Sequence, residues 1–148
     1  MMIVVATKEE IPLVEQMGFG GEPIIITGVG GTNVIKALKH LPEDTEIVNI
    51  GYVGSNVLPI GLAVDVGYSR LYHENVEYTE DIRCLSADGV NYDCYTSTDF
   101  VVKTKIEEPC VFDMELAFIC AMFKNVRAIK VVSDNLSVHQ YEKTVGAH

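Results

Sequence analysis

Short runs rich in valine and isoleucine alternate along this chain with longer stretches in which apolar residues recur every three or four positions. The short unbroken runs indicate strands buried on both faces, and the longer periodic stretches indicate amphipathic helices. Their alternation is typical of βαβ units arranged around a largely parallel sheet. The pattern therefore predicts an α/β fold with about five or six strands and with helices between them.

The predicted strands are bounded by glycine, proline or polar turn residues and span 2–6, 24–27, 47–50, 62–66 and 127–132. The predicted helices span 7–17, 33–41 and 114–123. Thr7 and Thr32 are expected helix caps, and Thr7 opens a T-x-x-E capping box that ends at Glu10. Residues 68–96 alternate apolar and polar positions with several breaks, which predicts short antiparallel or edge strands.

Length and composition narrow the class of protein. A chain of 148 residues that is 48% hydrophobic fits one domain, 1–148, able to bury roughly 68–70% of its unfolded surface. Its net charge of -10 argues against nucleic-acid and anionic-membrane partners, which require clustered Lys and Arg. Its apolar runs are far shorter than the roughly 20 residues needed to span a bilayer. The cysteines show no C-x-x-C spacing and no signal peptide precedes the first apolar run, so we expect reduced thiols and a cytoplasmic location.

Two carboxylates stand where predicted strands and helices meet. Met114-Glu115 opens an apolar helix, and Ser133-Asp134 follows an apolar strand. Upstream, the stretch N-I-G-Y-V-G at 49–54 follows another buried strand as a glycine-containing loop. Open α/β sheets bind small polar ligands at such junctions. Taken in this order, the three motifs resemble those of the nucleoside phosphorylase and nucleosidase superfamily, most closely its methylthioadenosine/S-adenosylhomocysteine nucleosidase branch.

The resemblance implies a three-layer α/β/α sandwich with a mixed, mostly parallel central sheet. It also implies hydrolysis of the N-glycosidic bond of a purine nucleoside or 5'-thionucleoside. Glu115 would hold the ribose, because a carboxylate can accept hydrogen bonds from both hydroxyls of a vicinal diol. Asp134 would protonate the departing purine, a step that requires a raised pKa. Glu10 would activate the attacking water, as the base of an inverting glycosidase does.

Each of these carboxylates also has a structural interpretation. A glutamate in the first turn of a helix is favoured by the helix dipole, which would account for Glu115. Asp134 would serve equally well as the cap of a last helix, and Glu10 as the third residue of the capping box. The joint occurrence of Glu115 with the downstream Ser-Asp pair favours the functional interpretation.

The resemblance further implies apolar contacts with the substrate. Phe100 lies in T-S-T-D-F-V at 96–101, where the family has a ring that stacks on the purine, although Thr98 replaces the family's aspartate. Met114 would pack on the sugar, and Phe112 belongs to the same motif.

Tyr52, Val53 and Gly54 belong to the loop that would line the base and ribose. Tyr52 replaces a small hydroxyl residue of the family motif, and its ring would occlude the pocket, stack on the base or point away. No metal ion or organic cofactor is implied. The expected partners are a small-molecule nucleoside and further copies of the chain in a homo-oligomer.

Two alternatives remain open. Family members are commonly longer, so parts of the fold, including most of a final helix, are expected to be missing. The chain would then be a non-catalytic nucleoside- or nucleobase-binding or assembly module that kept the fold. A phosphate-dependent phosphorylase is the other alternative, and it is disfavoured because Arg70, Arg83 and Arg127 lie outside the glycine turns that would hold phosphate.

Overall fold

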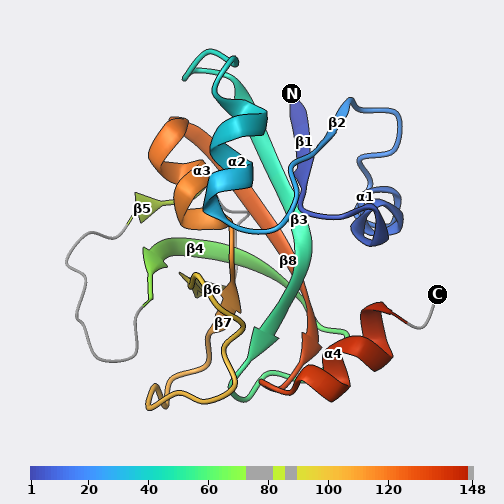
Figure 1. The fold of residues 1–148 in the computed structure, drawn as a ribbon, viewed down its shortest axis with the longest axis vertical. Coiled ribbons are helices and arrows are strands. Elements are labelled where there is room, and N and C mark those ends of the chain that lie inside the picture. Colours follow the sequence, from blue (N-terminus) through green and yellow to red (C-terminus); the bar gives the residue numbers. More distant parts are fainter. Residues whose placement is uncertain (73–81, 86–89, 147–148) are drawn as a thin grey trace.

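The computed structural model of the chain describes residues 1–72, 82–85 and 90–146. Its elements are β1 (Met2–Val5), η1 (Lys8–Glu10), α1 (Ile11–Gln16), β2 (Ile24–Ile26), α2 (Gly31–Leu38), β3 (Glu46–Ser55), β4 (Ala63–Leu71), β5 (Ile82–Arg83), β6 (Asn91–Thr96), β7 (Val111–Asp113), α3 (Leu116–Met122), β8 (Asn125–Asp134) and α4 (Val138–Val145) (Figure 1). η1 is a short 3-10 helix that leads directly into α1. Helices and strands alternate from β1 to β3, and again from β7 to α4.

All the described strands belong to one mixed sheet. Along its main path the order is β2-β1-β3-β7-β6-β4-β5, and β8 pairs with both β3 and β4. The pairs β1–β2, β1–β3, β3–β8, β4–β6 and β6–β7 are parallel, whereas β3–β7, β4–β5 and β4–β8 are antiparallel. Because β8 connects β4 back to β3, the strands β3, β7, β6, β4 and β8 form a closed circuit of pairings. The predicted mixed, mostly parallel sheet is confirmed.

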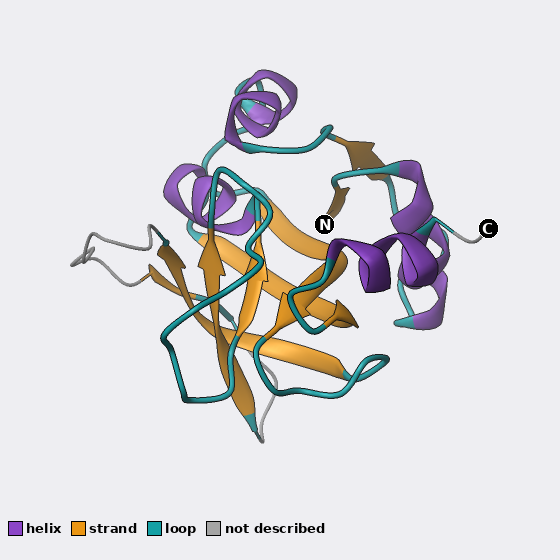
Figure 2. Cartoon of the chain, turned by 60° about the horizontal axis from the view of Figure 1, so that its bottom comes forward, coloured by secondary structure: helices purple, strands orange, loops and turns teal. Residues whose placement is uncertain are grey.

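The helices gather in two groups on different sides of the sheet (Figure 2). One hydrophobic cluster joins α1 to β1, β3 and β8 and includes Ile3, Leu13 and Ile129. The other joins α2 and α3 to the sheet and includes Val4 and Val34. Adjacent residues of β1 belong to different clusters, as the two-residue period of a strand requires. Both faces of the central strands are therefore buried, which explains their unbroken apolar runs and confirms the predicted α/β/α layers.

Several predicted boundaries are wrong. The strand predicted at 47–50 continues as β3 to Ser55, so its glycines are extended rather than in a loop. The strand predicted at 62–66 continues as β4 to Leu71. α2 has Gly30 rather than Thr32 as its N-cap, because the first helical bond runs from the Val34 N–H to the Gly30 carbonyl at 3.1 Å.

The region 68–96 differs further from its prediction. It contains the end of β4 and the strands β5 and β6, while 73–81 and 86–89 lie outside the described residues. β5 is antiparallel to β4, as predicted. β6, however, is parallel to β4 and β7 and lies inside the sheet rather than at an edge. Local alternation predicts a half-buried strand but not its neighbours, which tertiary packing determines.

The helix predicted over 7–17 is present as η1 followed by α1. The helix predicted over 114–123 begins later, at Leu116, because the Asp113 carboxylate accepts the Leu116 N–H at 2.8 Å. α4 lies outside the predicted elements, and its N-cap is Ser137, whose hydroxyl accepts the Gln140 N–H at 3.2 Å. Among the described residues, no helix has the length and apolar character needed to cross a membrane.

Candidate active site

The carboxyl ends of β1, β3 and β8 lie at one edge of the sheet, and the segment that follows β7 joins them there. Together they surround a cavity of about 80 Å³, with a side pocket of about 30 Å³ lined in part by Phe100 and Asp134. All the site residues predicted from the sequence line this cavity: Glu10, Tyr52, Val53, Gly54, Phe100, Phe112, Met114, Glu115 and Asp134. The fold therefore brings together residues that are more than a hundred positions apart in the chain.

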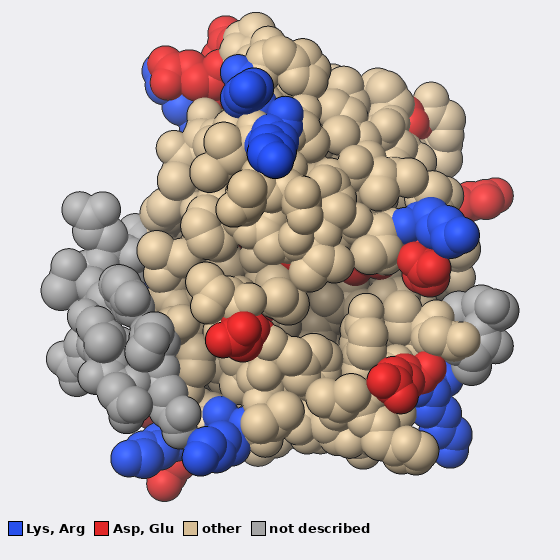
Figure 3. All heavy atoms as spheres, in the orientation of Figure 1, with Lys and Arg blue, Asp and Glu red and all other residues tan. Residues whose placement is uncertain are grey.

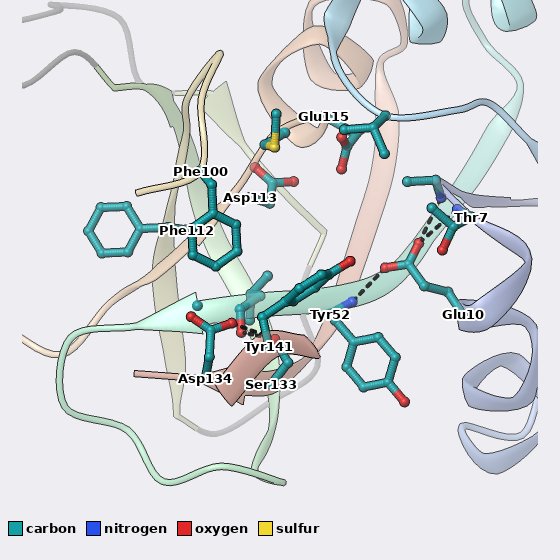
Figure 4. Close-up of a pocket in the computed structure, with 15 residues that line it drawn as sticks. Thr7, Glu10, Tyr52, Phe100, Phe112, Asp113, Glu115, Ser133, Asp134 and Tyr141 are labelled. Atoms are coloured by element: carbon teal, nitrogen blue, oxygen red, sulfur yellow. Dashed lines mark hydrogen bonds between the residues drawn. The ribbon is translucent and has the colours of Figure 1, made fainter. Parts of the chain in front are cut away.

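Glu10 enters the cavity from η1, and both of its carboxylate oxygens accept backbone N–H groups (Figure 4). Oε1 accepts the Ala6 N–H at 2.8 Å and the Thr7 N–H at 3.3 Å. Oε2 accepts the Tyr52 N–H at 2.7 Å, which links the β1–α1 connection to β3. Burial raises the pKa of Glu10, opposed by the positive charge of Lys130 and by these three hydrogen bonds.

Two glycines of β3 allow the carboxylates to approach the strand. A Cβ at Gly51 would lie 2.5 Å from Glu10 Oε2, and a Cβ at Gly54 would lie 3.0 Å from Asp134 Oδ2. Any side chain at these positions would displace a carboxylate. The glycines of the N-x-G-x-x-G stretch thus have a steric explanation that does not depend on a loop.

Glu115 is the N-cap residue of α3 and lines the cavity at the start of that helix (Figure 4). Its Oε2 accepts the Gly30 N–H at 2.8 Å. Burial, together with the nearby charge of Asp113, raises the pKa of Glu115 to about 7, although Lys130 opposes the shift. A carboxyl group at this pKa changes protonation state near neutral pH.

Asp134 ends β8 and is fully buried, with 0% of its surface exposed. The β3–β8 register shifts between Val53 and Gly54, so Asp134 rather than Ser133 lies opposite Gly54. The Ser133 hydroxyl lies 2.7 Å from Asp134 Oδ1 and 3.2 Å from the Val53 carbonyl oxygen. Asp134 Oδ2 accepts the Ser137 N–H at 3.3 Å, so the capping role considered for this residue is also present.

A buried ion pair lies beside these carboxylates. Lys130, in the middle of β8, donates from Nζ to the Asn49 side-chain oxygen and to Asp113 Oδ2, the latter at 3.3 Å. Asp113 Oδ1 accepts the Thr96 hydroxyl proton at 2.5 Å, and its Oδ2 also accepts the Leu116 N–H. Each oxygen of Asp113 is therefore hydrogen-bonded, and the ends of β6 and β7 are tied to the start of α3.

Lys130 influences both glutamates of the site although it does not line the cavity. Burial by itself would lower its pKa, but the surrounding acidic groups, Asp113 foremost and Glu10 and Glu115 with it, raise the pKa above its ordinary value. Lys130 therefore stays protonated. It supplies a positive charge that acts on both glutamates, because Coulomb interactions are strong in a poorly solvated interior.

The aromatic residues of the site have different roles. The Tyr52 ring points away from the carboxylates and packs beside the α1-side cluster, so of the three orientations considered it adopts the third (Figure 4). The Phe112 ring packs against both Tyr72 and Tyr95, at centroid distances of 5.3 Å and 5.7 Å, and the two tyrosine rings also contact each other. The Phe100 ring meets Tyr141 of α4 edge to face, at 5.5 Å and an interplanar angle of 68°.

Sequence reasoning missed Lys130, Asp113 and Tyr141 as parts of the site. Lys130 has a usable signal, since it interrupts the apolar run at 128–132, and a charge in a buried strand requires a buried partner. Asp113 stands next to the Met-Glu motif and offers the matching carboxylate. Tyr141 has no signal, because the length and packing of α4 decide whether it reaches the cavity.

No group of three or more His, Cys, Asp or Glu side chains is arranged to hold a metal ion among residues 1–72, 82–85 and 90–146. On the face viewed in Figure 3, Lys and Arg side chains stand toward the periphery, and acidic atoms are visible within a central hollow. The cavity lining itself includes neither Lys nor Arg among the residues described. This distribution favours a neutral or cationic small molecule over a phosphate-bearing one.

Comparisons with known proteins define the class of fold. No protein-family model and no curated protein sequence matches the chain. Solved structures do match over nearly its whole length, and among them are nucleosidases and a futalosine hydrolase. The chain therefore has the nucleoside phosphorylase/nucleosidase fold that the sequence motifs predicted.

Three of these structures illustrate the match, and each covers 99% of this chain. A variant of the MTAN from Chlamydia trachomatis, bound to MTA, has a TM-score of 0.77 at 13% identity, over 87% of its own chain. The 5'-methylthioadenosine/S-adenosyl homocysteine nucleosidase of Helicobacter pylori has a TM-score of 0.73 at 14% identity, over 90% of its chain. The futalosine hydrolase of the same organism has a TM-score of 0.73 at 13% identity, also over 90%. At such low identity the similarity establishes the fold.

Proposed function

We propose that the protein hydrolyses the N-glycosidic bond of a purine nucleoside or 5'-thionucleoside, releasing the free base and the sugar. One observation carries the proposal: Glu10, Glu115 and Asp134, from three separate parts of the chain, line a single cavity. The shared fold supports it, since the structural neighbours described above are nucleosidases. Cleavage of an N-glycosidic bond needs both a base for the water and an acid for the leaving group.

Glu115 is the proposed ribose-binding residue. Among the residues that the structure describes, one N–H, that of Gly30, occupies one of its approximately four lone-pair positions, so acceptor positions remain for a vicinal diol. Met114 lies beside it at the cavity wall and would pack on the sugar. The two residues together would fix the sugar against the start of α3.

Asp134 is the proposed acid for the departing base, and Glu10 the proposed base for water. Both line the cavity, and Asp134 shares a side pocket with Phe100, which would contact the purine. Backbone N–H groups of the described residues occupy three of the approximately four lone-pair positions of Glu10, and the fourth would accept a proton from water. Water is the proposed nucleophile because, among the residues described, the lining includes no cation to hold phosphate.

Chromatography of released base tests this proposal. The purified protein is incubated with methylthioadenosine, S-adenosylhomocysteine, adenosine and inosine, each with and without phosphate. We expect release that does not depend on phosphate. Glu10→Gln and Asp134→Asn should each reduce the rate by about 10²–10⁴, the usual contribution of a general acid or base. Glu9→Gln is the matched control, because Glu9 is adjacent in sequence but does not line the cavity.

The pH dependence of binding tests the role of Glu115 separately. Its pKa of about 7 means that it becomes a better acceptor as the pH rises from 6 to 8. Binding of adenosine should therefore strengthen over this range, whereas binding of adenine, which has no diol, should not follow the same curve. Parallel curves for the two ligands, measured by titration calorimetry, would contradict this role of Glu115.

The second candidate is a binding module without catalytic activity. The cavity of about 80 Å³ is small, because ligand pockets usually begin at roughly 300 Å³, and it favours binding of a bare nucleobase over cleavage of a whole nucleoside. Binding of adenine or adenosine by a folded sample that releases no base from any of the four nucleosides would select this alternative. Strict dependence of release on phosphate would instead select a phosphorylase.

The homo-oligomer predicted from the resemblance is part of the same proposal. Large apolar side chains are exposed on β2 at Ile26, in the following turn at Val29 and on α2 at Ile35. Association would remove this apolar surface from water. Size-exclusion chromatography with light scattering should give a mass above the 16.3 kDa of one chain, and Ile35→Glu should lower it.

A further inference from the structure

Tyr141 occupies part of the cavity where the proposed ligand would bind. Its ring projects from α4 into the space between Phe100 and Glu10, and the hydroxyl end points toward the Glu10 side (Figure 4). The ring meets Phe100, the residue predicted to stack on a purine, edge to face at 5.5 Å. A residue of the chain itself thus contacts the proposed base-binding surface.

Tyr141 lies close enough to the carboxylates of Glu10 and Glu115 to feel their charge. Burial raises its pKa, and the negative charges of Glu10 and Glu115 raise it further. The phenol therefore remains neutral across the physiological range. The side of the cavity that it occupies, next to Glu10, coincides with space that the sugar of a bound nucleoside would need, because Glu10 is the proposed base for the water that attacks the sugar (Figure 4).

α4 holds this ring in place at several points. The Ser137 N–H donates to Asp134 Oδ2 at 3.3 Å, and the Gln140 N–H donates to the Ser137 hydroxyl at 3.2 Å. The Asn135 N–H donates to the Gln140 side-chain oxygen at 2.8 Å, and Val145 is buried near the far end of the helix. The tyrosine is consequently part of the wall of the site.

We propose that Tyr141 is a specificity-determining residue, whose ring competes with the ligand for space and makes the site favour compact ligands over those with large 5' substituents. The proposal rests on the proposed function, because it concerns the ligand of the same site. A ring fixed in the cavity leaves less room for a ligand. The loss of affinity should be greater for a ligand that must place more atoms around the ring. Adenine needs only the side near Asp134, whereas S-adenosylhomocysteine must also extend past the sugar.

Binding of four ligands of increasing size tests the proposal: adenine, adenosine, methylthioadenosine and S-adenosylhomocysteine. Titration calorimetry measures each dissociation constant for the wild type, Tyr141→Phe and Tyr141→Ala. In the wild type the affinity should fall along the series. Tyr141→Ala should improve the affinity for S-adenosylhomocysteine tenfold or more and that for adenine less than about threefold, which flattens the series. Tyr141→Phe keeps the ring and should keep the wild-type order.

Tyr68→Ala is the matched control, because Tyr68 is 41% exposed on β4 and its truncation also removes a phenol. Thermal unfolding of each variant confirms that it is folded. An equal improvement for all four ligands in Tyr141→Ala would overturn the proposal, since the ring would then cover the site without selecting by size. Weaker binding of all four would overturn it as well, since the ring would be a binding surface. Failure of every folded variant to bind any ligand would contradict the proposed function itself.

Discussion

Glu10 and Glu115 have the same side chain, are 7% and 8% exposed and line the same cavity, yet they are held in different ways. Glu10 accepts three backbone N–H groups, from Ala6, Thr7 and Tyr52. Glu115 accepts one, from Gly30. Burial raises the pKa of both, and for Glu115 it reaches about 7. The two carboxylates are therefore similar in burial and differ in the number of backbone hydrogen bonds that hold them.

This difference separates an anchored carboxylate from an available one. The three bonds of Glu10 connect η1 to β3, so this side chain contributes to stability even without a ligand. Glu115 keeps most of its acceptor capacity and has little to satisfy it in the unliganded protein. A bound diol would supply the hydrogen bonds that Glu115 lacks, and this is the physical reason to assign ligand binding to Glu115 and a fixed position to Glu10.

Replacement of the cation that both glutamates share should have the largest effect. Lys130→Met leaves Asp113 as a buried charge without its partner, and loss of one member of a buried pair typically costs about 3–5 kcal/mol. It also removes the charge that lowers the pKa of Glu10 and Glu115. Urea unfolding at pH 7 should show this loss of stability.

Lys130→Met combined with Asp113→Asn is the control for that experiment. The double variant has neither charge, and it should be more stable than Lys130→Met alone. A single Lys130→Met variant as stable as the wild type would show that Asp113 is satisfied without the lysine, through Thr96 and Leu116 alone. The charge of Lys130 would then not be needed to explain the properties of the two glutamates.

The different hydrogen bonding of Glu10 and Glu115 predicts unequal losses of stability when each side chain is truncated to alanine. Glu10→Ala leaves three backbone N–H groups without an acceptor, and we expect a loss of about 3 kcal/mol in the free energy of unfolding. Glu115→Ala leaves only the Gly30 N–H and also removes a carboxyl that is unfavourable to ionise, so we expect no more than about 1 kcal/mol. Urea unfolding of the two variants side by side measures the difference. Equal losses would mean that the hydrogen bonds of Glu10 contribute little.

The sequence alone was sufficient to predict the motifs at the strand ends and the buried parallel strands β1 and β3. Val-Ile runs mark strands buried on both faces, and each predicted carboxylate lies next to such a run, so chain order alone predicts that Glu10, Glu115 and Asp134 approach one another. The strand through Gly51 and Gly54 could not be predicted. Its glycines serve to admit carboxylates from η1 and from the end of β8, and local propensity carries no information about such distant side chains.

The ion pair and the tyrosine of α4 were missed for different reasons. Lys130 and Asp113 are 17 residues apart and become partners only because β8 and β7 both border β3. Tyr141 enters the cavity because the backbone between Asp134 and Ser137 turns through Leu136, which has a positive φ of 61°. A left-handed leucine is uncommon, and no sequence pattern predicts it.

A smaller effect is expected from the charge of Glu115, and it should depend on pH. The pKa of Glu115 rises from 4.5 to about 7 on folding, so between these values the folded state binds more protons than the unfolded state. Stability therefore falls as the pH rises through this window. Glu115→Gln removes this penalty and should stabilise the protein by roughly 2 kcal/mol at pH 8, with little effect at pH 4.5.

Thermal unfolding of wild type and Glu115→Gln at both pH values measures this difference. Glu107→Gln is the matched control, because it makes the same substitution at an exposed position. A stabilisation of the same size at both pH values would indicate a packing effect rather than the loss of an ionisable group. A destabilisation at pH 8 would show that ionised Glu115 is better satisfied than its single hydrogen bond suggests.

The smallest effect is expected at Tyr52, whose backbone rather than side chain takes part in the comparison. Its N–H holds Glu10 Oε2 at 2.7 Å, while its ring points away from the carboxylates and packs beside the α1-side cluster. Tyr52→Phe keeps both features, so it should change the free energy of unfolding by less than about 0.5 kcal/mol. Adenosine affinity, measured by calorimetry, should stay within about twofold of the wild type. A tenfold change would mean that the ring turns toward the ligand when the site is occupied, and that the hydroxyl of this tyrosine replaces the small hydroxyl of the family motif.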